Sequence, residues 1–133
     1  MRIGLDTNVI VSAVAARGLC ADLFQVILLE HELVIGETVL VELRRVLSEK
    51  FHVPDATIKT LEGLLRRQAA IVAAESDAAI DGLDSADTAV LHEAAAGSVD
   101  VFVTGDRELQ DLRQSAVQIV SPRGLWDMLR RAT

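Results

Sequence analysis

The chain has 133 residues with 20 acidic and 13 basic side chains, so its formal net charge is −7 and its isoelectric point is about 4.8. This length predicts a single domain over residues 1–133, and the acidity argues against a basic nucleic-acid clamp or a membrane-surface helix. One cysteine excludes an internal disulfide and a cysteine-based zinc site, and three Phe, one Trp and no Tyr argue against a base-stacking platform.

The first half of the chain predicts alternating strands and helices. Short apolar runs that end at a polar residue or glycine indicate strands, and apolar residues spaced three or four apart indicate helices. In chain order we predict a strand over 2–5, helices over 8–16 and 21–29, a strand over 33–35, and a helix over 38–48 with Thr38 as its N-cap.

The second half continues the alternation after a break at Pro54. We predict a helix that opens at Asp55, a strand over 70–73, an acidic loop over 75–83, a helix over 85–96, a strand over 101–104, a short helix, a strand over 117–120, and a last helix after Pro122. The start of the sequence, MRIGLDTN, has no apolar targeting segment, and no apolar run approaches a membrane span, so we expect a cytoplasmic protein.

This alternation predicts an α/β fold with three layers, in which a mostly parallel sheet carries helices on both faces. Such sheets bind ligands at the carboxyl ends of their strands. Asp6 follows the first predicted strand and Asp106 follows the strand over 101–104. Both acids are therefore expected at that edge of the sheet.

Two further acids border apolar helix faces. Glu42 has Val39 three residues before it and Val46 four after it. Asp87 is followed by apolar residues at the third, fourth and seventh positions. A carboxylate beside a core stripe is costly to desolvate unless a cation or a hydrogen-bond donor compensates it. If these acids meet Asp6 and Asp106, a divalent cation such as Mg²⁺ or Mn²⁺ would relieve their repulsion.

Each acid also has a structural reading that needs no ligand. Asp6 suits a helix cap, and Asp106 suits a turn after Gly105. Glu42 has a basic residue three positions on, with which it could pair on a solvated face. Asp84 and Asp87 suit the first turn of a helix, where acids oppose the helix dipole. The ordered set in its strand and helix contexts favours a site.

The ordered motifs resemble the PIN-domain ribonucleases, and most of all the VapC-like toxins of bacterial and archaeal toxin–antitoxin pairs. The resemblance spans essentially the whole chain. It rests on the run Asp6-Thr7-Asn8-Val9-Ile10 after a short strand, Glu42 on a helix, Asp87 opening an Ala-rich helix, and the block Val103-Thr104-Gly105-Asp106-Arg107-Glu108-Leu109.

The resemblance implies a Mg²⁺- or Mn²⁺-dependent endoribonuclease that leaves 3′-hydroxyl and 5′-phosphate ends. It assigns the metal-binding carboxylates to Asp6, Glu42, Asp87 and Asp106. In supporting roles, Asn8 would hold a carboxylate or water and Thr104 would orient Asp106 or a bound water. Asp84 could serve instead of Asp87 or beside it, and Arg107 could contact a phosphate oxygen.

The resemblance also implies partners, namely an RNA substrate, a small antitoxin that holds the toxin inactive, and a second copy in a homodimer. An antitoxin arginine placed among the carboxylates would imitate the cation. The alternative function is a PIN-like binding module without catalysis. A phosphatase is disfavoured because Asn8 stands where a second Asp is needed, a receiver domain because no lysine follows a late strand, and a nucleotide-cofactor fold because Gly-x-Gly-x-x-Gly is absent.

Overall fold

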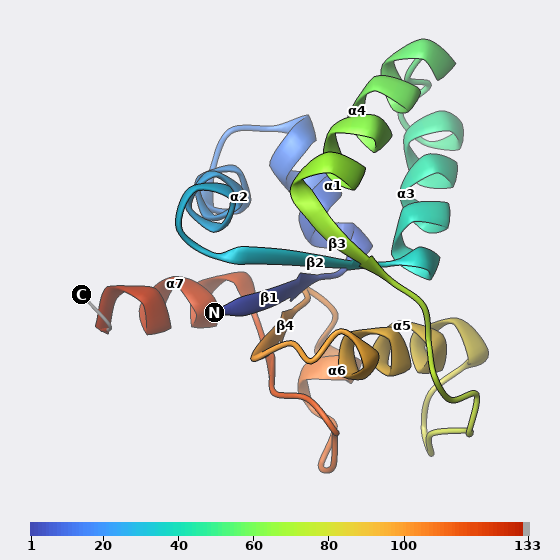
Figure 1. Cartoon of the computed structure of the whole chain (residues 1–133), viewed down its shortest axis with the longest axis vertical. Helices are drawn as coiled ribbons and strands as arrows, with labels where there is room; N and C mark the ends of the chain where they lie inside the picture. Colours follow the sequence, from blue (N-terminus) through green and yellow to red (C-terminus); the bar gives the residue numbers. More distant parts are fainter. Residues whose placement is uncertain (132–133) are drawn as a thin grey trace.

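The computed structural model describes residues 1–131 and places a parallel β-sheet between two layers of helices (Figure 1). Five strands form the sheet in the order β3-β2-β1-β4-β5, and each pairs in parallel with its neighbours. They are β1 (Arg2–Leu5), β2 (Glu32–Gly36), β3 (Ala69–Val72), β4 (Val101–Val103) and β5 (Ile119–Val120). The expected three-layer α/β fold is confirmed, and every strand pair in the described chain is parallel.

Seven helices connect or follow these strands in the described residues. They are α1 (Thr7–Ala15), α2 (Leu19–Glu30), α3 (Glu37–Glu49), α4 (Asp55–Gln68), α5 (Ser85–Ala96), α6 (Arg107–Gln110) and α7 (Pro122–Arg131). The helices α1 to α4 cover one face of the sheet, and α5 and α6 cover the other (Figure 1). This division follows from the topology. The chain first adds β2 and β3 on one side of β1, and it then returns to add β4 and β5 on the other side.

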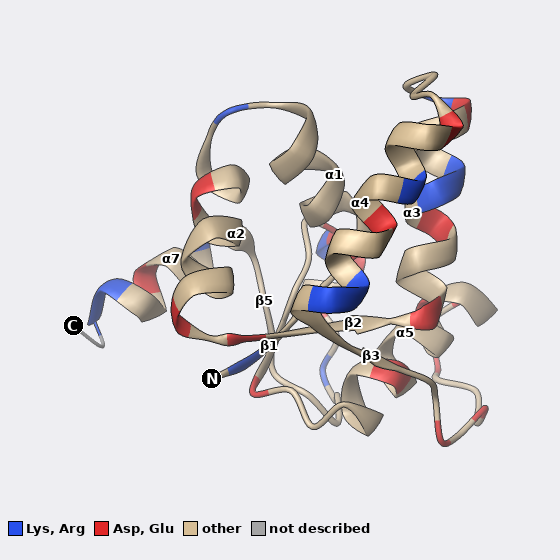
Figure 2. Ribbon diagram, turned by 45° about the horizontal axis from the view of Figure 1, so that its top comes forward, with Lys and Arg blue, Asp and Glu red and all other residues tan. Residues whose placement is uncertain are grey.

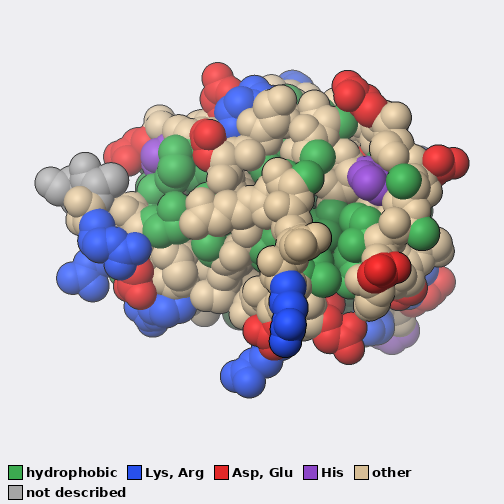
Figure 3. All heavy atoms as spheres, turned by 90° about the horizontal axis from the view of Figure 1, so that it is seen from below, with side chains coloured by type: hydrophobic (Ala, Val, Ile, Leu, Met, Phe, Trp, Pro, Cys, Tyr) green, Lys and Arg blue, Asp and Glu red, His purple; other side chains and the backbone are tan. Residues whose placement is uncertain are grey.

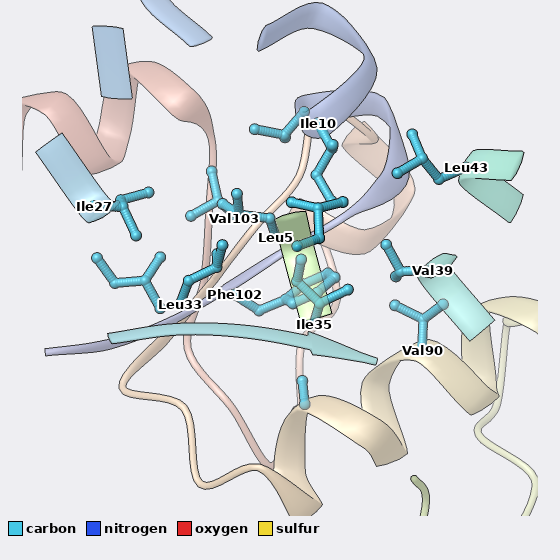
Figure 4. Packing of buried hydrophobic residues seen from close by; sticks show 14 of the residues in the cluster. Leu5, Ile10, Ile27, Leu33, Ile35, Val39, Leu43, Val90, Phe102 and Val103 are labelled. Carbon is cyan, nitrogen blue, oxygen red and sulfur yellow. The ribbon is translucent and has the colours of Figure 1, made fainter. Parts of the chain in front are cut away.

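The core lies on both faces of the sheet and consists of aliphatic side chains together with Phe102 (Figure 4). Leu5, Leu33 and Val103 come from the strands and are at most 2% exposed. Ile10 from α1 and Val90 from α5 pack against the strands from the helices. The strands carry apolar residues almost continuously because both of their faces are covered. A buried sheet of this kind holds its strand ends rigidly, which matters for any group attached there.

Several predicted boundaries differ from the structure by one or two residues. The strand predicted over 70–73 lies at Ala69–Val72, and the one predicted over 117–120 is reduced to Ile119–Val120. The second helix starts at Leu19 rather than residue 21, and β4 ends at Val103, which leaves Thr104 outside the strand. The last of these shifts has a functional consequence, because it frees the Thr104 side chain to serve the site described below.

The N-cap predicted at Thr38 is wrong. The helix begins at Glu37, and its N-cap is Gly36, which has no side chain to offer. A buried carboxylate from another helix takes this role: Glu93 of α5 accepts from the backbone N–H of Thr38 at 2.8 Å and from the Thr38 hydroxyl. Glu93 is only 4% exposed, so these bonds and the helix dipole compensate its burial.

The outer surface of α3 and α4 carries charges of both signs (Figure 2). Arg44 of α3 pairs with Glu62 of α4, and Arg66 of α4 reaches both Glu62 and Glu37. Arg44 and Arg66 therefore join α3 and α4 by ion pairs. On the face below the sheet, hydrophobic side chains gather at the surface (Figure 3).

No single helix in residues 1–131 is long and apolar enough to cross a membrane. Helices α1 and α2 together reach the length and apolar composition of a membrane span. They are bent by 103° relative to each other.

Candidate active site

The carboxyl ends of β1 and β4 form the centre of the candidate site. These strands are neighbours, and the chain leaves β1 toward one edge of the sheet and β4 toward the other. Parallel sheets bind ligands at such a topological switch point, because the connections diverge there and leave a crevice. Asp6 directly follows β1, and Thr104, Gly105 and Asp106 directly follow β4.

Asp6 is a buried carboxylate, only 7% exposed, with three hydrogen-bond donors. The Thr7 backbone N–H donates to Oδ1 at 2.8 Å, and the Thr104 hydroxyl and the Asn8 side-chain amide donate to Oδ2 at 2.7 and 3.2 Å. Burial raises the pKa of Asp6, the hydrogen bonds from Thr104 and Thr7 oppose that rise, and the nearby Glu42 charge adds to it. The donors hold the carboxylate in one orientation.

Thr104 links the two strand ends and is fully buried. Its hydroxyl donates its one proton to Asp6 and accepts from the backbone N–H of Asp106 at 3.0 Å. The Gln110 side-chain amide donates to the Thr104 backbone carbonyl at 2.7 Å, and the side-chain oxygen Oδ1 of Asn8 accepts from the Gly105 N–H at 2.8 Å. This network fixes the loop after β4 to the start of α1.

Glu42 enters the site from α3. The Thr7 hydroxyl donates to its Oε2 at 2.8 Å, which joins α3 to the residue after Asp6. The pairing with Arg45 considered from the sequence is not found, because Arg45 contacts Glu49 instead. Glu42 is half-buried, so one side of the carboxylate is still open to solvent.

Asp87 and Asp84 both lie at the start of α5 but in different roles. Asp84 is exposed and caps the helix by accepting from the backbone N–H of Asp87 at 2.8 Å. The pKa of Asp87 is raised to about 6, mainly by burial and then by the charges of Asp84, Asp106, Asp6 and Glu42 in that order. The pKa of Asp87 is thus raised by the negative charge of every other acid of the site.

Asp106 is half-buried and also caps a helix, because its Oδ1 accepts from the backbone N–H of Glu108 at 2.9 Å. The neighbouring Arg107 is exposed and does not line the cleft. Asp6 and Asp106 therefore do have the capping geometry of the structural reading, and each keeps a second oxygen for other partners.

These acids line one cleft of about 470 Å³. It is bordered by α1, α3 and the starts of α5 and α6, and its lining consists of Asp6, Thr7, Asn8, Val11, Ser12, Glu42, Val46, Lys50, Phe51, Asp87 and Asp106. All four carboxylates singled out as metal ligands are in this set, and Asp84 is not. Four segments far apart in sequence thus supply one acidic surface.

The donor set of this cleft fits a hard divalent cation. Carboxylate and amide oxygens are the ligands that Mg²⁺ and Mn²⁺ prefer, and the mutual repulsion that raises the pKa of Asp87 is what a cation would relieve. Within the described residues, no three His, Cys, Asp or Glu side chains already stand close enough together to hold an ion. We therefore expect the more exposed carboxylates to move inward when a cation binds, with Asp6 as the fixed member.

Asp87→Asn is expected to raise the free energy of unfolding by about 1 kcal/mol in EDTA at pH 7.5, after allowance for solvent screening. Above pH 6 the folded protein carries the ionised, repelled carboxylate. As the pH falls from 6 toward 4, the folded state takes up a proton that the unfolded state does not, so the wild type regains this stability. The advantage of the variant should therefore disappear at pH 4 in urea denaturation.

Asp77→Asn is the control for this measurement, because it removes the same charge from an exposed loop position. An equal gain in that variant, or a gain from Asp87→Asn that is the same at pH 4 and 7.5, would contradict the assignment of the repulsion to the cleft. With Mn²⁺ added, the wild type should gain more stability than Asp87→Asn.

Sequence reasoning missed three residues that shape the site. Gln110 supports the Thr104 carbonyl, and Lys50 and Phe51 form part of the cleft wall at the end of α3. Gln110 stands four residues after Asp106 in a short helix, a spacing that returns its side chain toward the strand end. Nothing local in the sequence marks Lys50 or Phe51, since their position depends on how α3 packs against α1.

A family model for the PIN domain matches residues 2–108. The chain belongs to the PIN domain family. The match includes β1, the acids of the cleft and the loop after β4, so every carboxylate discussed above lies inside the family region. The chain has no match among curated proteins.

Solved structures share this fold at low sequence identity. The structure of VapBC2 from Rickettsia felis bound to a DNA fragment from their promoter aligns with a TM-score of 0.64 at 12% identity, covering 91% of this chain and 98% of that one. VapBC-1 from nontypeable Haemophilus influenzae gives 0.61 at 16% identity, covering 92% and 99%. FitAcB from Neisseria gonorrhoeae gives 0.57 at 17% identity, covering 91% and 98%. These likenesses establish the PIN fold over nearly all of the chain.

Proposed function

We propose that this protein is a divalent-metal-dependent endoribonuclease, with residues 1–133 forming one nuclease domain. The observation that carries the proposal is the single cleft in which Asp6, Glu42, Asp87 and Asp106 meet at the switch point of the sheet. A scaffold has no need to concentrate carboxylates that repel one another. The PIN domain family supports a nuclease in general, and the RNA substrate and the metal are the finer parts of the proposal.

The roles of the cleft residues would differ according to how firmly each side chain is held. A bound Mg²⁺ or Mn²⁺ supplies activation of a water as nucleophile and stabilisation of charge on the phosphate. Asp6 would be the fixed ligand, because three donors orient it. Glu42, Asp87 and Asp106 would complete the set, and Asn8 and Thr104 would keep Asp6 in place.

The toxin role is the second part of the proposal. The sequence motifs resemble VapC-like toxins, and two of the structural neighbours named above are VapBC structures, which supports a small antitoxin as the partner of this chain. In that setting the protein acts in the cytoplasm, as a homodimer, and an antitoxin arginine among the carboxylates would inhibit it in place of a cation.

A binding module without catalysis is the alternative, and the capping bonds of Asp6 and Asp106 favour it. If the acids serve only to cap helices, a divalent cation has no site in the cleft. Addition of Mn²⁺ should then leave the melting temperature unchanged, whereas a loaded site raises it by an amount set by the ratio of cation concentration to Kd.

Cleavage of a labelled, circular single-stranded RNA tests the proposal. We expect linear products in Mg²⁺ or Mn²⁺, with 5′-phosphate and 3′-hydroxyl ends, and none in EDTA. A circular substrate has no ends, so its opening demonstrates endonuclease action. Intact RNA in all conditions, together with an unchanged melting temperature in Mn²⁺, would instead establish the binding module.

A further inference from the structure

One wall of the acidic cleft is formed by Lys50 and Phe51, which follow one another at the end of α3. The Phe51 side chain is 51% exposed, although the chain has only three Phe and buries Phe102 almost completely. Lys50 is exposed and is the only Lys or Arg among the described residues that line the cleft. An exposed ring thus stands beside a cation at the edge of an acidic site.

The turn that presents Phe51 is fixed on both sides. The backbone N–H of Lys50 still donates to the Val46 carbonyl at 2.9 Å, and that of Val53 returns to the Leu47 carbonyl at 2.9 Å. Between them His52 has a φ of 52°, the left-handed conformation in which helices commonly end. This helix end therefore fixes the backbone that presents the preceding ring at the surface.

Phe51 also borders a second hollow. An apolar pocket of about 430 Å³ lies between the ends of α1 and α3 and the start of α4, and Phe51 lines both this pocket and the acidic cleft. The end of α3 and the start of α4 lie together at one extremity of the molecule (Figure 1). The ring thus stands between an apolar recess, where a flat hydrophobic group fits, and the carboxylates.

We propose that Phe51 is a stacking site for a base of single-stranded RNA next to the scissile bond, and that Lys50 holds the adjacent phosphate. Stacking on an aromatic ring accepts any base, and a lysine is a suitable point charge for a phosphate oxygen. The inference rests on the proposed nuclease function and gives it a substrate-binding residue. The low aromatic content still excludes an extended stacking platform, but one ring is sufficient for one base.

The charge of the cleft makes this arrangement necessary. The four carboxylates repel an RNA backbone in the absence of a cation, and the chain as a whole is acidic. Base stacking adds affinity that does not depend on charge, and Lys50 offsets the repulsion at one phosphate. Among the described residues that line the cleft, Phe51 is the aromatic side chain and Lys50 is the cationic one.

The test compares two fluorescein-labelled probes in EDTA, so that binding is measured without cleavage: a single-stranded adenosine RNA 10-mer and an abasic 10-mer of the same length. We expect Phe51→Ala to raise the Kd of the adenosine probe about ten-fold and to leave the abasic probe unchanged. Phe51→Trp should bind the adenosine probe at least as tightly as the wild type, and Phe51→Leu should behave like Phe51→Ala.

Lys50→Gln should lower the slope of log Kd against log salt by about 0.7 for both probes, as expected for one lost phosphate contact on a single strand. Lys59→Gln removes the same charge from the exposed surface of α4, where it pairs with Asp55, and should leave the slope unchanged. Leu64→Ala, a partly exposed apolar residue that does not line either pocket, is the matched control for Phe51→Ala.

Unchanged binding in Phe51→Ala, equal losses for both probes, or no saturable binding by the wild type would overturn the stacking site. Wild-type affinity in Phe51→Leu would also overturn it and indicate an apolar contact of the kind that a protein partner makes. Binding that depends on Phe51 without cleavage in Mg²⁺ would leave the stacking site in place and refute the nuclease. Cleavage in Mg²⁺ with a KM that Phe51→Ala does not change would support the nuclease and refute the stacking site.

Discussion

Asp6→Asn is expected to lower kcat/KM for RNA cleavage roughly a thousand-fold, which corresponds to the loss of several kcal/mol of charge stabilisation by a metal. Asn has the same shape as Asp but is neutral, so it is a far weaker ligand for a hard cation. Asp6 is the most constrained acid of the cleft, since three donors and its burial leave it one orientation. The other carboxylates of the cleft are more exposed and therefore less firmly oriented. They can replace Asp6 as a ligand less well than Asp6 could replace one of them.

The fold of Asp6→Asn should persist. The amide oxygen can still accept from the Thr7 N–H, and the amide nitrogen can donate to the Thr104 hydroxyl oxygen, while the longer bond from the Asn8 amide is lost because two NH₂ groups would face each other. Burial disfavours the charged form of Asp6 and thereby raises its pKa, so a neutral side chain removes that cost. In EDTA we expect a melting temperature equal to or above that of the wild type, and a smaller increase on addition of Mn²⁺.

Asp100→Asn is the matched control. Asp100 immediately precedes β4 at the opposite end of the same pair of strands, and its carboxylate accepts from the Arg2 backbone N–H at 2.7 Å. The Asp100→Asn variant loses the same charge as Asp6→Asn, at a position that is hydrogen-bonded but exposed and far from the cleft. Its cleavage rate should therefore equal that of the wild type. A well-folded Asp6→Asn protein with more than a tenth of the wild-type kcat/KM would refute the central role of Asp6.

The sheet was predictable because its signals are local. Each strand is a short apolar run closed by a polar residue or glycine, and parallel sheets need this pattern because both of their faces are buried. Asp6 and Asp106 could be placed for the same reason, since the residues that directly follow a parallel strand lie at the carboxyl edge of the sheet. Their position depends on the strand alone and not on the rest of the fold.

Residues that depend on packing between distant segments could not be placed from the sequence. Thr38 has the residue type of an N-cap, yet the cap of α3 is a carboxylate 55 residues further along the chain. Glu93 carries a weak signal, because it sits between the apolar Val90 and Ala94 on one helix face. That pattern indicates a buried acid but says nothing about its partner. Lys50 and Phe51 likewise owe their role to where α3 ends beside α1.

Gly36→Ala is expected to lower the free energy of unfolding by about 2 kcal/mol, because it displaces a buried, hydrogen-bonded carboxylate. A Cβ at Gly36 would lie 2.1 Å from Oε1 of Glu93 and 2.9 Å from its Cβ. The backbone of Gly36, with φ −75° and ψ 151°, suits any residue, so the cost comes from the collision and not from strain. Glu93 would have to leave Thr38 and expose the start of α3 without its cap.

Gly63→Ala provides the contrast that isolates this mechanism. Gly63 lies inside α4, where the nearest atom to an added Cβ is the flexible tip of Arg67 at 3.4 Å. There alanine should stabilise the protein by about 0.5–1 kcal/mol through helix propensity. Urea denaturation of both variants should therefore move the midpoint in opposite directions. If Gly36→Ala also stabilises the protein, the Glu93 carboxylate can move away without cost. The cap that α5 provides would then not be what holds α3, and with it Glu42, against the cleft.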